Sequence, residues 1–227
     1  MGVRIIKVII FGATGMVGQS VLRECIVDDT VQEVLTVGRQ GTGQHHEKLK
    51  EIVLEKVAEL SSIESEIIGF DACFFCLGVS SAGMKEEEYR KITYDITLSV
   101  AETLVRLNSQ MTFIYVSGSG TDSSEKGRIM WARVKGKTEN DLLRLPFKRA
   151  YMFRPGGIIP MHGVKSKTKW YQLFYNVMRP FNHLFLKSSL FISSEQLGRA
   201  MIKVARDGYS ESIIESSEIK TCLESSM

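Results

Sequence analysis

The sequence is poor in cysteine and proline, with four residues of each among 227. No apolar run approaches the 18 residues of a transmembrane helix, and the short apolar stretch near the N-terminus leads into glycines instead of a signal-peptide cleavage site. Lys and Arg number 29 and Asp and Glu 26, so the net charge of +3 is too small to indicate nucleic acid as a partner. We therefore expect a cytoplasmic protein with no membrane span and no nucleic-acid partner.

The cysteines and histidines do not form a pattern typical of a redox or metal site. Cys73 and Cys76 lie three residues apart in an apolar run that predicts a buried strand. Residues at that spacing point to opposite faces of a strand, roughly 10 Å apart, which exceeds the ~7 Å reach of a disulfide. His45 and His46 lie in a Gly- and Gln-rich loop with no acidic or cysteine cluster nearby. The sequence therefore predicts no metal site.

Short apolar runs alternate with helix-like patterns from one end of the chain to the other. The runs are almost continuously apolar, as is typical of parallel strands covered on both faces. These predicted strands cover residues 8–11, 34–37, 52–54, 72–77, 113–116 and 151–153. Apolar residues at helical spacing predict helices over 86–107 and 129–143. A capping box at Ser193 and Gln196 predicts a further helix that ends at Gly208.

This alternation predicts an α/β fold with a Rossmann-type, doubly wound parallel sheet. The regular pattern is lost after residue 155, where Lys, aromatic and Met residues become more frequent. We therefore expect residues 1–160 to form an NAD(P)-binding core. Residues 161–227 are expected to form a small C-terminal extension on the substrate side, packed on the same domain.

The most specific motif is Gly12-Ala13-Thr14-Gly15-Met16-Val17-Gly18, which follows the first predicted strand and begins a helix. Gly12 would allow a tight turn, Gly15 would let the backbone approach a pyrophosphate, and Gly18 would let helix and strand pack closely. Amides at the helix N-terminus would bind the phosphate charge. The predicted cofactor contacts here are Gly12, Thr14, Gly15, Met16 and Val17. The alternative is a glycine-rich turn without a ligand.

The end of the second predicted strand indicates which dinucleotide would bind. An NAD-binding chain has Asp or Glu about 20 residues after the glycine loop, where it binds the ribose hydroxyls. This chain has Val37-Gly38-Arg39 there. A guanidinium suits a 2′-phosphate, so the sequence favours NADP(H) over NAD(H). Alternatively, Arg39 is a solvated loop residue.

Five short segments carry a resemblance to a known family. They are the GxxGxxG loop, Cys76-Leu77-Gly78, Val116-Ser117-Gly118, Val134-Lys135-Gly136 and Phe153-Arg154-Pro155-Gly156. Together they resemble the atypical and extended, epimerase-like branch of the short-chain dehydrogenase/reductase superfamily, and more distantly TIP thirty-like oxidoreductases. The resemblance covers residues 4–160. It implies cofactor contacts from Leu77, Gly78, Lys135, Pro155 and Gly156.

The resemblance also implies catalytic positions, and one of them departs from the family. A Ser after the fifth strand orients the substrate carbonyl and a helix Lys binds the nicotinamide ribose, positions that Ser117 and Lys135 match. The family's catalytic Tyr, four residues before that Lys, is replaced by Trp131. An indole N–H donates a hydrogen bond but does not exchange a proton near pH 7. Because acid–base help is worth about 10²–10⁴-fold in rate, the usual proton relay is in doubt.

Several interpretations of this replacement stay open. Ser117, Ser119, Tyr94 or an ordered water could supply the proton. The chain could instead be a non-catalytic, NADP(H)-binding regulatory or redox-sensing protein that acts through a partner. Trp131 could be a stacking platform for nicotinamide or an aromatic substrate, or a helix residue that fills the wall of the cleft.

The substrate is the least determined part of the prediction. Lys165, Lys167 and Lys169 alternate in one loop and could, with Arg154, hold an anionic substrate, although a solvated loop is the commoner explanation for such residues. We expect an NADP(H)-binding oxidoreductase or epimerase-like protein that acts on a small carbonyl or sugar-like substrate. A homo-oligomer is compatible with the sequence, which does not demand one.

Overall fold

A computed structural model describes residues 4–163, 188 and 190–224. Its strands are β1 (Ile6–Phe11), β2 (Val31–Gly38), β3 (Leu49–Val53), β4 (Ala72–Phe75), β5 (Thr112–Val116), β6 (Arg149–Arg154), β7 (Gly157–Ile159), β8 (Phe191–Ser193) and β9 (Ile213–Glu215). Its α-helices are α1 (Met16–Val27), α2 (Glu64–Ile67), α3 (Glu86–Arg90), α4 (Ile96–Leu107), α5 (Met130–Arg144), α8 (Ser194–Asp207) and α9 (Ser216–Glu224). A short 3₁₀ turn, Ser61–Ile63, precedes α2, and a π-helical turn, Lys91–Asp95, joins α3 to α4.

The main sheet has seven strands in the order β3-β2-β1-β4-β5-β6-β9, and every neighbouring pair is parallel. The chain leaves β1 toward β2 and β3 on one side and returns to β4 on the other. The order of strands therefore reverses between β1 and β4, the place where open α/β sheets bind ligands. The predicted Rossmann-type, doubly wound sheet is confirmed.

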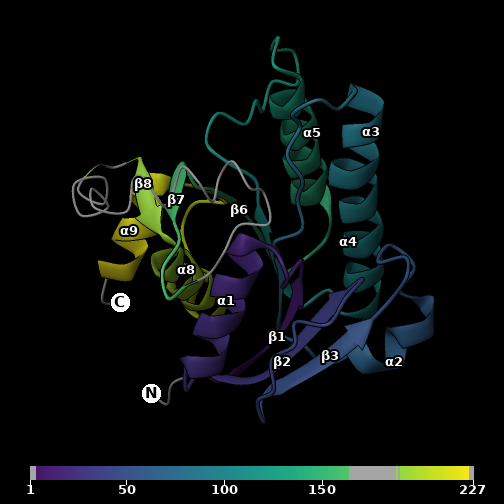
Figure 1. Ribbon diagram of the computed structural model, residues 1–227, viewed down its shortest axis with the longest axis vertical. Coiled ribbons are helices and arrows are strands. Elements are labelled where there is room, and N and C mark those ends of the chain that lie inside the picture. The colour runs from purple at the N-terminus through teal and green to yellow at the C-terminus, as the bar shows by residue number, and fades with distance from the viewer. Residues whose placement is uncertain (1–3, 164–187, 189, 225–227) are drawn as a thin grey trace.

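Alternate residues of each central strand belong to two different hydrophobic clusters. In β1, Val8 and Ile10 pack with α1, α8 and α9, whereas Ile9 and Phe11 pack with α2, α4 and α5. Figure 1 shows α1 and α8 on one side of the sheet and α4 and α5 on the other. Both faces are covered, which explains why the strands are almost continuously apolar in sequence.

The C-terminal part of the described chain contributes to the same sheet. Strand β9 pairs with β6, α8 packs against α1, and β7 and β8 form a separate two-stranded sheet. The capping box at Ser193 and Gln196 and the end of α8 at Gly208 agree with the prediction. The division of the chain at residue 160 stays a prediction.

Several boundaries differ from those predicted. β3 begins at Leu49, earlier than predicted. It is an edge strand with exposed residues, so its apolar pattern in the sequence is weak. β4 ends at Phe75, although the Cys76 amide still donates a hydrogen bond to the Phe11 carbonyl of β1 at 2.9 Å. Cys73 packs in one hydrophobic cluster and Cys76 against the other, as their spacing predicted. Burial raises the pKa of the Cys76 thiol to about 12, which leaves it unreactive.

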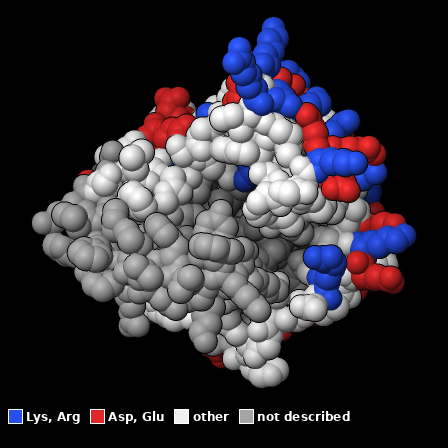
Figure 2. Space-filling view, turned by 45° about the horizontal axis from the view of Figure 1, so that its top comes forward, with Lys and Arg blue, Asp and Glu red and all other residues white. Residues whose placement is uncertain are grey.

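The surface carries charges of both signs. Along the upper and right-hand margins of the face drawn in Figure 2, Lys and Arg side chains are interspersed with Asp and Glu. None of the helices in the described ranges is long and apolar enough to cross a membrane.

Candidate functional site

The glycine loop joins β1 to α1 in a turn that needs glycine at two positions. Gly12 has φ +81°, and a Cβ there would lie 2.6 Å from the backbone nitrogen of Leu77. A Cβ on Gly18 would lie 2.1 Å from the carbonyl oxygen of Gly12. These distances are too short for any side chain. Gly12 is therefore required for the turn, and Gly18 is required for the close packing of helix α1 on strand β1.

Gly15 has a different place, at the N-cap of α1. Its φ of −79° is ordinary for any residue, and it has no side chain to cap the helix. The first-turn amides of α1, including those of Met16 and Val17, are therefore left for another acceptor. The side chains of Met16 and Val17 pack against the core, and the carbonyl of Thr14 accepts a hydrogen bond from the Gln19 side chain at 2.9 Å. These residues can reach a ligand through their backbone.

Leu77 and Gly78 follow β4, directly beside the turn at Gly12. Leu77 is half-buried, whereas Gly78 is exposed and a Cβ on it would meet nothing within 4 Å. The ends of β1 and β4 therefore form one open edge at the point where the strand order reverses.

Arg39 lies beyond the end of β2, on the other side of the glycine loop. It is exposed and makes no hydrogen bond or ion pair with another described residue. The loop after it is held by Glu51 in β3, which accepts a hydrogen bond from the Thr42 amide at 2.7 Å and from the Thr36 hydroxyl at 3.1 Å. Burial opposes ionisation of Glu51, but these hydrogen bonds outweigh it and lower its pKa. Glu51 is therefore an anion that orders this loop.

Ser117 and Lys135 meet at the end of β5. The Lys135 Nζ, on α5, donates a hydrogen bond to the main-chain carbonyl of Ser117. Burial lowers the pKa of Lys135 to about 8, while the carboxylate of Glu139, one turn further along α5, opposes this shift. The predicted pair is thus brought together, although it is the Ser117 carbonyl that contacts the amine.

The Ser117 hydroxyl belongs to a buried network. It faces two acceptors, the Glu139 carboxylate and, at 3.2 Å, the Phe153 carbonyl. A hydroxyl has one proton to donate, so none is left for a substrate carbonyl. Glu139 is 0% exposed and forms an ion pair with the guanidinium of Arg154, which is 8% exposed. Arg154 also donates to the Ser123 hydroxyl at 2.6 Å.

Arg154 is therefore not free to hold an anionic substrate, as the sequence had suggested. Burial opposes its charge, yet the hydrogen bonds to Glu139 outweigh this and raise its pKa. On its outer side the guanidinium lies 3.4 Å from Glu215 of β9. Lys165, Lys167 and Lys169 lie outside the described residues. The role of Arg154 is to join α5, β6 and β9.

Trp131 lies on α5 one turn before Lys135 and faces the loop after β5. A Cβ on Gly120, which has φ +83°, would lie 3.6 Å from the indole ring. Tyr94, one of the alternative proton sources, donates its hydroxyl proton to Asp141 at 2.6 Å. That hydrogen bond is the main reason why its pKa is raised, and it ties Tyr94 to α5 away from Lys135. The Ser119 hydroxyl is exposed.

Pro155 and Gly156 form the turn between β6 and β7. The Pro155 carbonyl accepts a hydrogen bond from the Ser119 amide at 2.9 Å, and the Gly156 amide donates to the Ser216 hydroxyl at 2.6 Å. A Cβ on Gly156 would lie 2.3 Å from the Leu190 carbonyl oxygen. This turn is thus positioned against both the β5 loop and the C-terminal segment.

Sequence reasoning assigned no role to two residues that hold the site together. Glu139 shares a helical face with Trp131 and Lys135, a spacing that could have drawn attention to it. Gly136 is required because a Cβ on it would lie 1.8 Å from the carbonyl oxygen of Asp122, where the β5–α5 loop crosses the helix. No local pattern marks that crossing.

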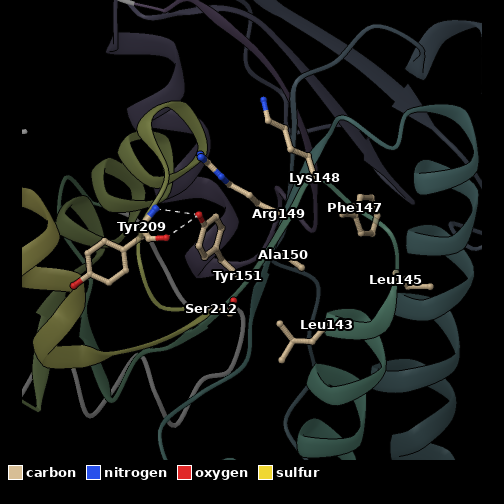
Figure 3. Close-up of a pocket in the computed structure, with 9 residues that line it drawn as sticks. All are labelled: Leu143, Leu145, Phe147, Lys148, Arg149, Ala150, Tyr151, Tyr209 and Ser212. Carbon is tan, nitrogen blue, oxygen red and sulfur yellow. Dashed lines mark hydrogen bonds between the residues drawn. The ribbon is translucent and has the colours of Figure 1, made fainter.

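A separate cavity of about 290 Å³ lies at the opposite edge of the sheet, where β6 begins. Figure 3 shows Tyr151 beside the loop that precedes β9, with its hydroxyl bonded to the backbone nitrogen and oxygen of Tyr209 at 3.0 and 3.2 Å. The amino ends of parallel strands face away from the glycine loop. This cavity is therefore distinct from the candidate site.

Comparison with known proteins identifies the family. The model of the NAD dependent epimerase/dehydratase family matches residues 8–184, more than half of the chain. The chain belongs to this family. Protein FMP52-2, mitochondrial, of Scheffersomyces stipitis is 31% identical over 152 residues, which are 65% of this chain and 64% of that protein. Protein FMP52, mitochondrial, of Kluyveromyces lactis is 25% identical over 205 residues, which are 88% of this chain and 89% of that protein.

Solved structures agree in fold. WbmF of Bordetella bronchiseptica, in complex with NAD+, superposes with a TM-score of 0.67 at 13% identity, covering 96% of this chain and 77% of that one. The UDP-N-acetylglucosamine 4-epimerase of Methanobrevibacter ruminantium, in complex with UDP-N-acetylmuramic acid, gives 0.69 at 16% identity, covering 93% and 76%. At such identities the likeness shows a shared Rossmann-type fold.

The names of the FMP52 relatives correct one expectation. Four of them, from four fungi, are labelled mitochondrial. The predicted cytoplasmic location is therefore wrong. It rested on the lack of a membrane span and a signal peptide, features that say nothing about compartments within the cell.

Proposed function

We propose that this chain binds a nicotinamide dinucleotide across the β1–β4 edge and acts as an oxidoreductase or epimerase-like protein. The observation that carries the proposal is the glycine loop, in which Gly12 and Gly18 are required by close backbone contacts and Gly15 leaves the first amides of α1 open. A helix N-terminus of this kind suits a pyrophosphate. The family to which the chain belongs is named for its dependence on NAD.

Residues on neighbouring strands would hold the rest of the cofactor. Leu77 and Gly78 line the edge beside Gly12, and the Lys135 amine at the end of β5 suits the hydroxyls of a ribose. When bound, the cofactor would supply or accept a hydride at this edge. Pro155 and Gly156, in the turn after β6, would line the side of the site that is farthest from the glycine loop.

NADP(H) is the proposed dinucleotide. Arg39 is exposed, has no partner among the described residues, and stands where NAD-binding chains carry a carboxylate. Its guanidinium suits a 2′-phosphate. The substrate would be a small carbonyl or sugar-like compound, oriented by the Ser119 hydroxyl or a water, because the Ser117 hydroxyl is already bonded.

Calorimetric titration of the cofactor-free protein with NADPH and, separately, NADH tests this proposal. We expect tight binding of NADPH and weaker binding of NADH. Equal affinity for NADPH and NADH would contradict only the proposed role of Arg39 and would leave the binding of a dinucleotide standing. Binding of neither would mean that the glycine loop is only a turn.

A second candidate is a redox sensor that binds NADP(H) without turnover. The replacement of the family's Tyr by Trp131 favours it, since two of the alternative proton donors, Ser117 and Tyr94, have their hydroxyls bonded to carboxylates. Oxidation of NADPH by any carbonyl compound would argue against this candidate.

A further inference from the structure

Reduction of a carbonyl group requires a proton for its oxygen, and two of the groups expected to give it are occupied. The Ser117 hydroxyl is bonded to Glu139, and the Tyr94 hydroxyl is bonded to Asp141. The indole of Trp131 does not exchange a proton near pH 7. The Ser119 hydroxyl is exposed and can hydrogen-bond a substrate, but a proton donor with a pKa near the working pH is still required.

Lys135 is a titratable group beside the indole whose protons are not all used. It lies one helical turn from Trp131, so the two side chains share a face of α5. An ammonium has three N–H donors, and the Lys135 amine gives one to the Ser117 carbonyl. It makes no other hydrogen bond or ion pair with the described residues, so two donors remain.

We propose that Lys135 is itself the proton donor and acceptor of this site, with Glu139 as its positioning residue. This inference rests on the proposed function. Lys135 gives a proton to the carbonyl oxygen as hydride from a reduced nicotinamide dinucleotide reaches the carbonyl carbon. The π electron pair of the C=O bond becomes the new O–H bond, the products are an alcohol and the oxidised dinucleotide, and the neutral amine regains its proton from solvent.

Glu139 has the contacts that positioning requires. Through the Ser117 hydroxyl it fixes the residue whose carbonyl holds the Lys135 amine, and its own carboxylate is held by Arg154. The other charge in this group is Glu215 of β9, on the outer side of Arg154. Glu139 therefore acts on Lys135 both through Ser117 and through its charge.

The electrostatic environment of Lys135 agrees with its role as a proton donor. Burial lowers the pKa of Lys135 to about 8, and Glu139 keeps it from falling further. A proton donor is most effective when its pKa lies near the working pH, and lysines tuned to about 7–8 serve in this way. At neutral pH Lys135 is mostly charged and ready to donate.

The first experiment needs neither cofactor nor substrate. Acylation of the wild-type protein with acetic anhydride over pH 6–11, with peptide mass spectrometry, gives the titration of the Lys135 amine. We expect a midpoint about 2 units below that of an ordinary lysine, and a still lower midpoint in Glu139→Gln. A wild-type midpoint near the ordinary lysine value would overturn the proposal.

The second experiment separates proton transfer from charge. NADPH binding is measured by calorimetry, and oxidation of NADPH by benzaldehyde and by 2,3-butanedione is followed at several pH values. We expect kcat to fall above pH 8 in the wild type, and to drop about 100-fold or more in Lys135→Met and Lys135→Arg. Lys135→Arg keeps the charge but does not release a proton, and its NADPH affinity is measured beside its kcat so that a loss of binding is told apart from a loss of proton transfer. Lys137→Met, a control on the same helix, should keep both binding and turnover.

The outcomes distinguish the two proposals. Failure of the wild type to bind NADPH or NADH overturns the proposed function and this inference with it. If NADPH binds, then full turnover in Lys135→Arg, or no turnover in the wild type with either carbonyl, overturns the role of Lys135 and leaves the binding proposal standing.

Discussion

The Ser117 hydroxyl donates its hydrogen bond to a carboxylate, Glu139, that is fully buried and paired with Arg154. The resemblance to short-chain dehydrogenases implies that this hydroxyl faces the substrate. Here it faces the protein. The buried pair of Glu139 and Arg154 therefore fixes the end of β5, and we assign the proposed proton transfer to Lys135.

Gly15→Asp tests the glycine loop without disturbing the fold. Asp is a favourable N-cap residue and Gly15 has an ordinary φ, so the melting temperature should stay level or rise. The new carboxylate would occupy the open amides of α1 and repel a pyrophosphate, so NADPH affinity should fall at least about 100-fold, as two or more lost charge-assisted hydrogen bonds imply. Calorimetry with Gly15→Ala as the control measures this, and unchanged affinity in the Asp variant would contradict the proposed phosphate site.

Arg39→Ala should separate the two dinucleotides. Loss of one charge-assisted contact to a 2′-phosphate is worth about 1.5–3 kcal/mol, which is roughly a 10- to 150-fold loss of NADPH affinity. NADH affinity should change little. Arg106→Ala, an exposed arginine that pairs with Glu64, provides the control. An equal loss for both dinucleotides would show that Arg39 does not read the 2′-phosphate.

Glu139→Ala should destabilise the fold more than a change at the other carboxylate beside Arg154. It leaves a buried guanidinium without its main partner, which costs about 3–5 kcal/mol. Glu215→Gln, the control, changes a 43% exposed group at 3.4 Å, and a loss below about 1 kcal/mol is expected. Urea denaturation compares the two. Similar losses would mean that the buried pair is not the anchor we describe.

The lowered pKa of Lys135 predicts a pH dependence of stability. With a folded pKa of about 8 and an unfolded one near 10.4, the unfolded chain binds more protons in that window, so Lys135 makes stability rise with pH from about 8 to 10.4. Lys135→Met removes the cost of burying the charge and should be more stable than wild type at pH 7, by about 1–3 kcal/mol. The gap should shrink by pH 10, whereas a pH-independent gap would contradict the shift. Lys126→Met, at an exposed lysine, is the control.

Trp131→Tyr should raise any carbonyl reductase activity. It places a phenol, which can exchange a proton, one turn from Lys135. We expect a gain of about 10-fold or more in kcat for NADPH oxidation, with Trp131→Phe, which lacks the hydroxyl, showing none. No gain in the Tyr variant would indicate that the loop at Gly120 is shaped around the indole.

Much of the cofactor edge could be predicted from sequence because the glycine spacing that marks it is local. Gly18 is required by a contact within the β1–α1 unit, whereas Gly12 is required by the backbone of Cys76 and Leu77, which follow β4. The short apolar strands reflect cover on both faces of the sheet. The network behind β5 could not be predicted in the same way. Its members come from β5, α5, β6 and β9, and nothing in the sequence around Glu139 shows that Arg154 lies opposite.

The sequence by itself therefore determined the class of fold, the position of the glycine loop and the replacement of the family's Tyr by Trp131, since each depends on residue type at short spacing. Only the tertiary structure decided what the side chains at the site face. Ser117 and Arg154 each looked available for a substrate, and both are bonded within the protein. A buried charge must find its partner wherever the fold brings one, and that pairing spans distances along the chain that no local pattern records.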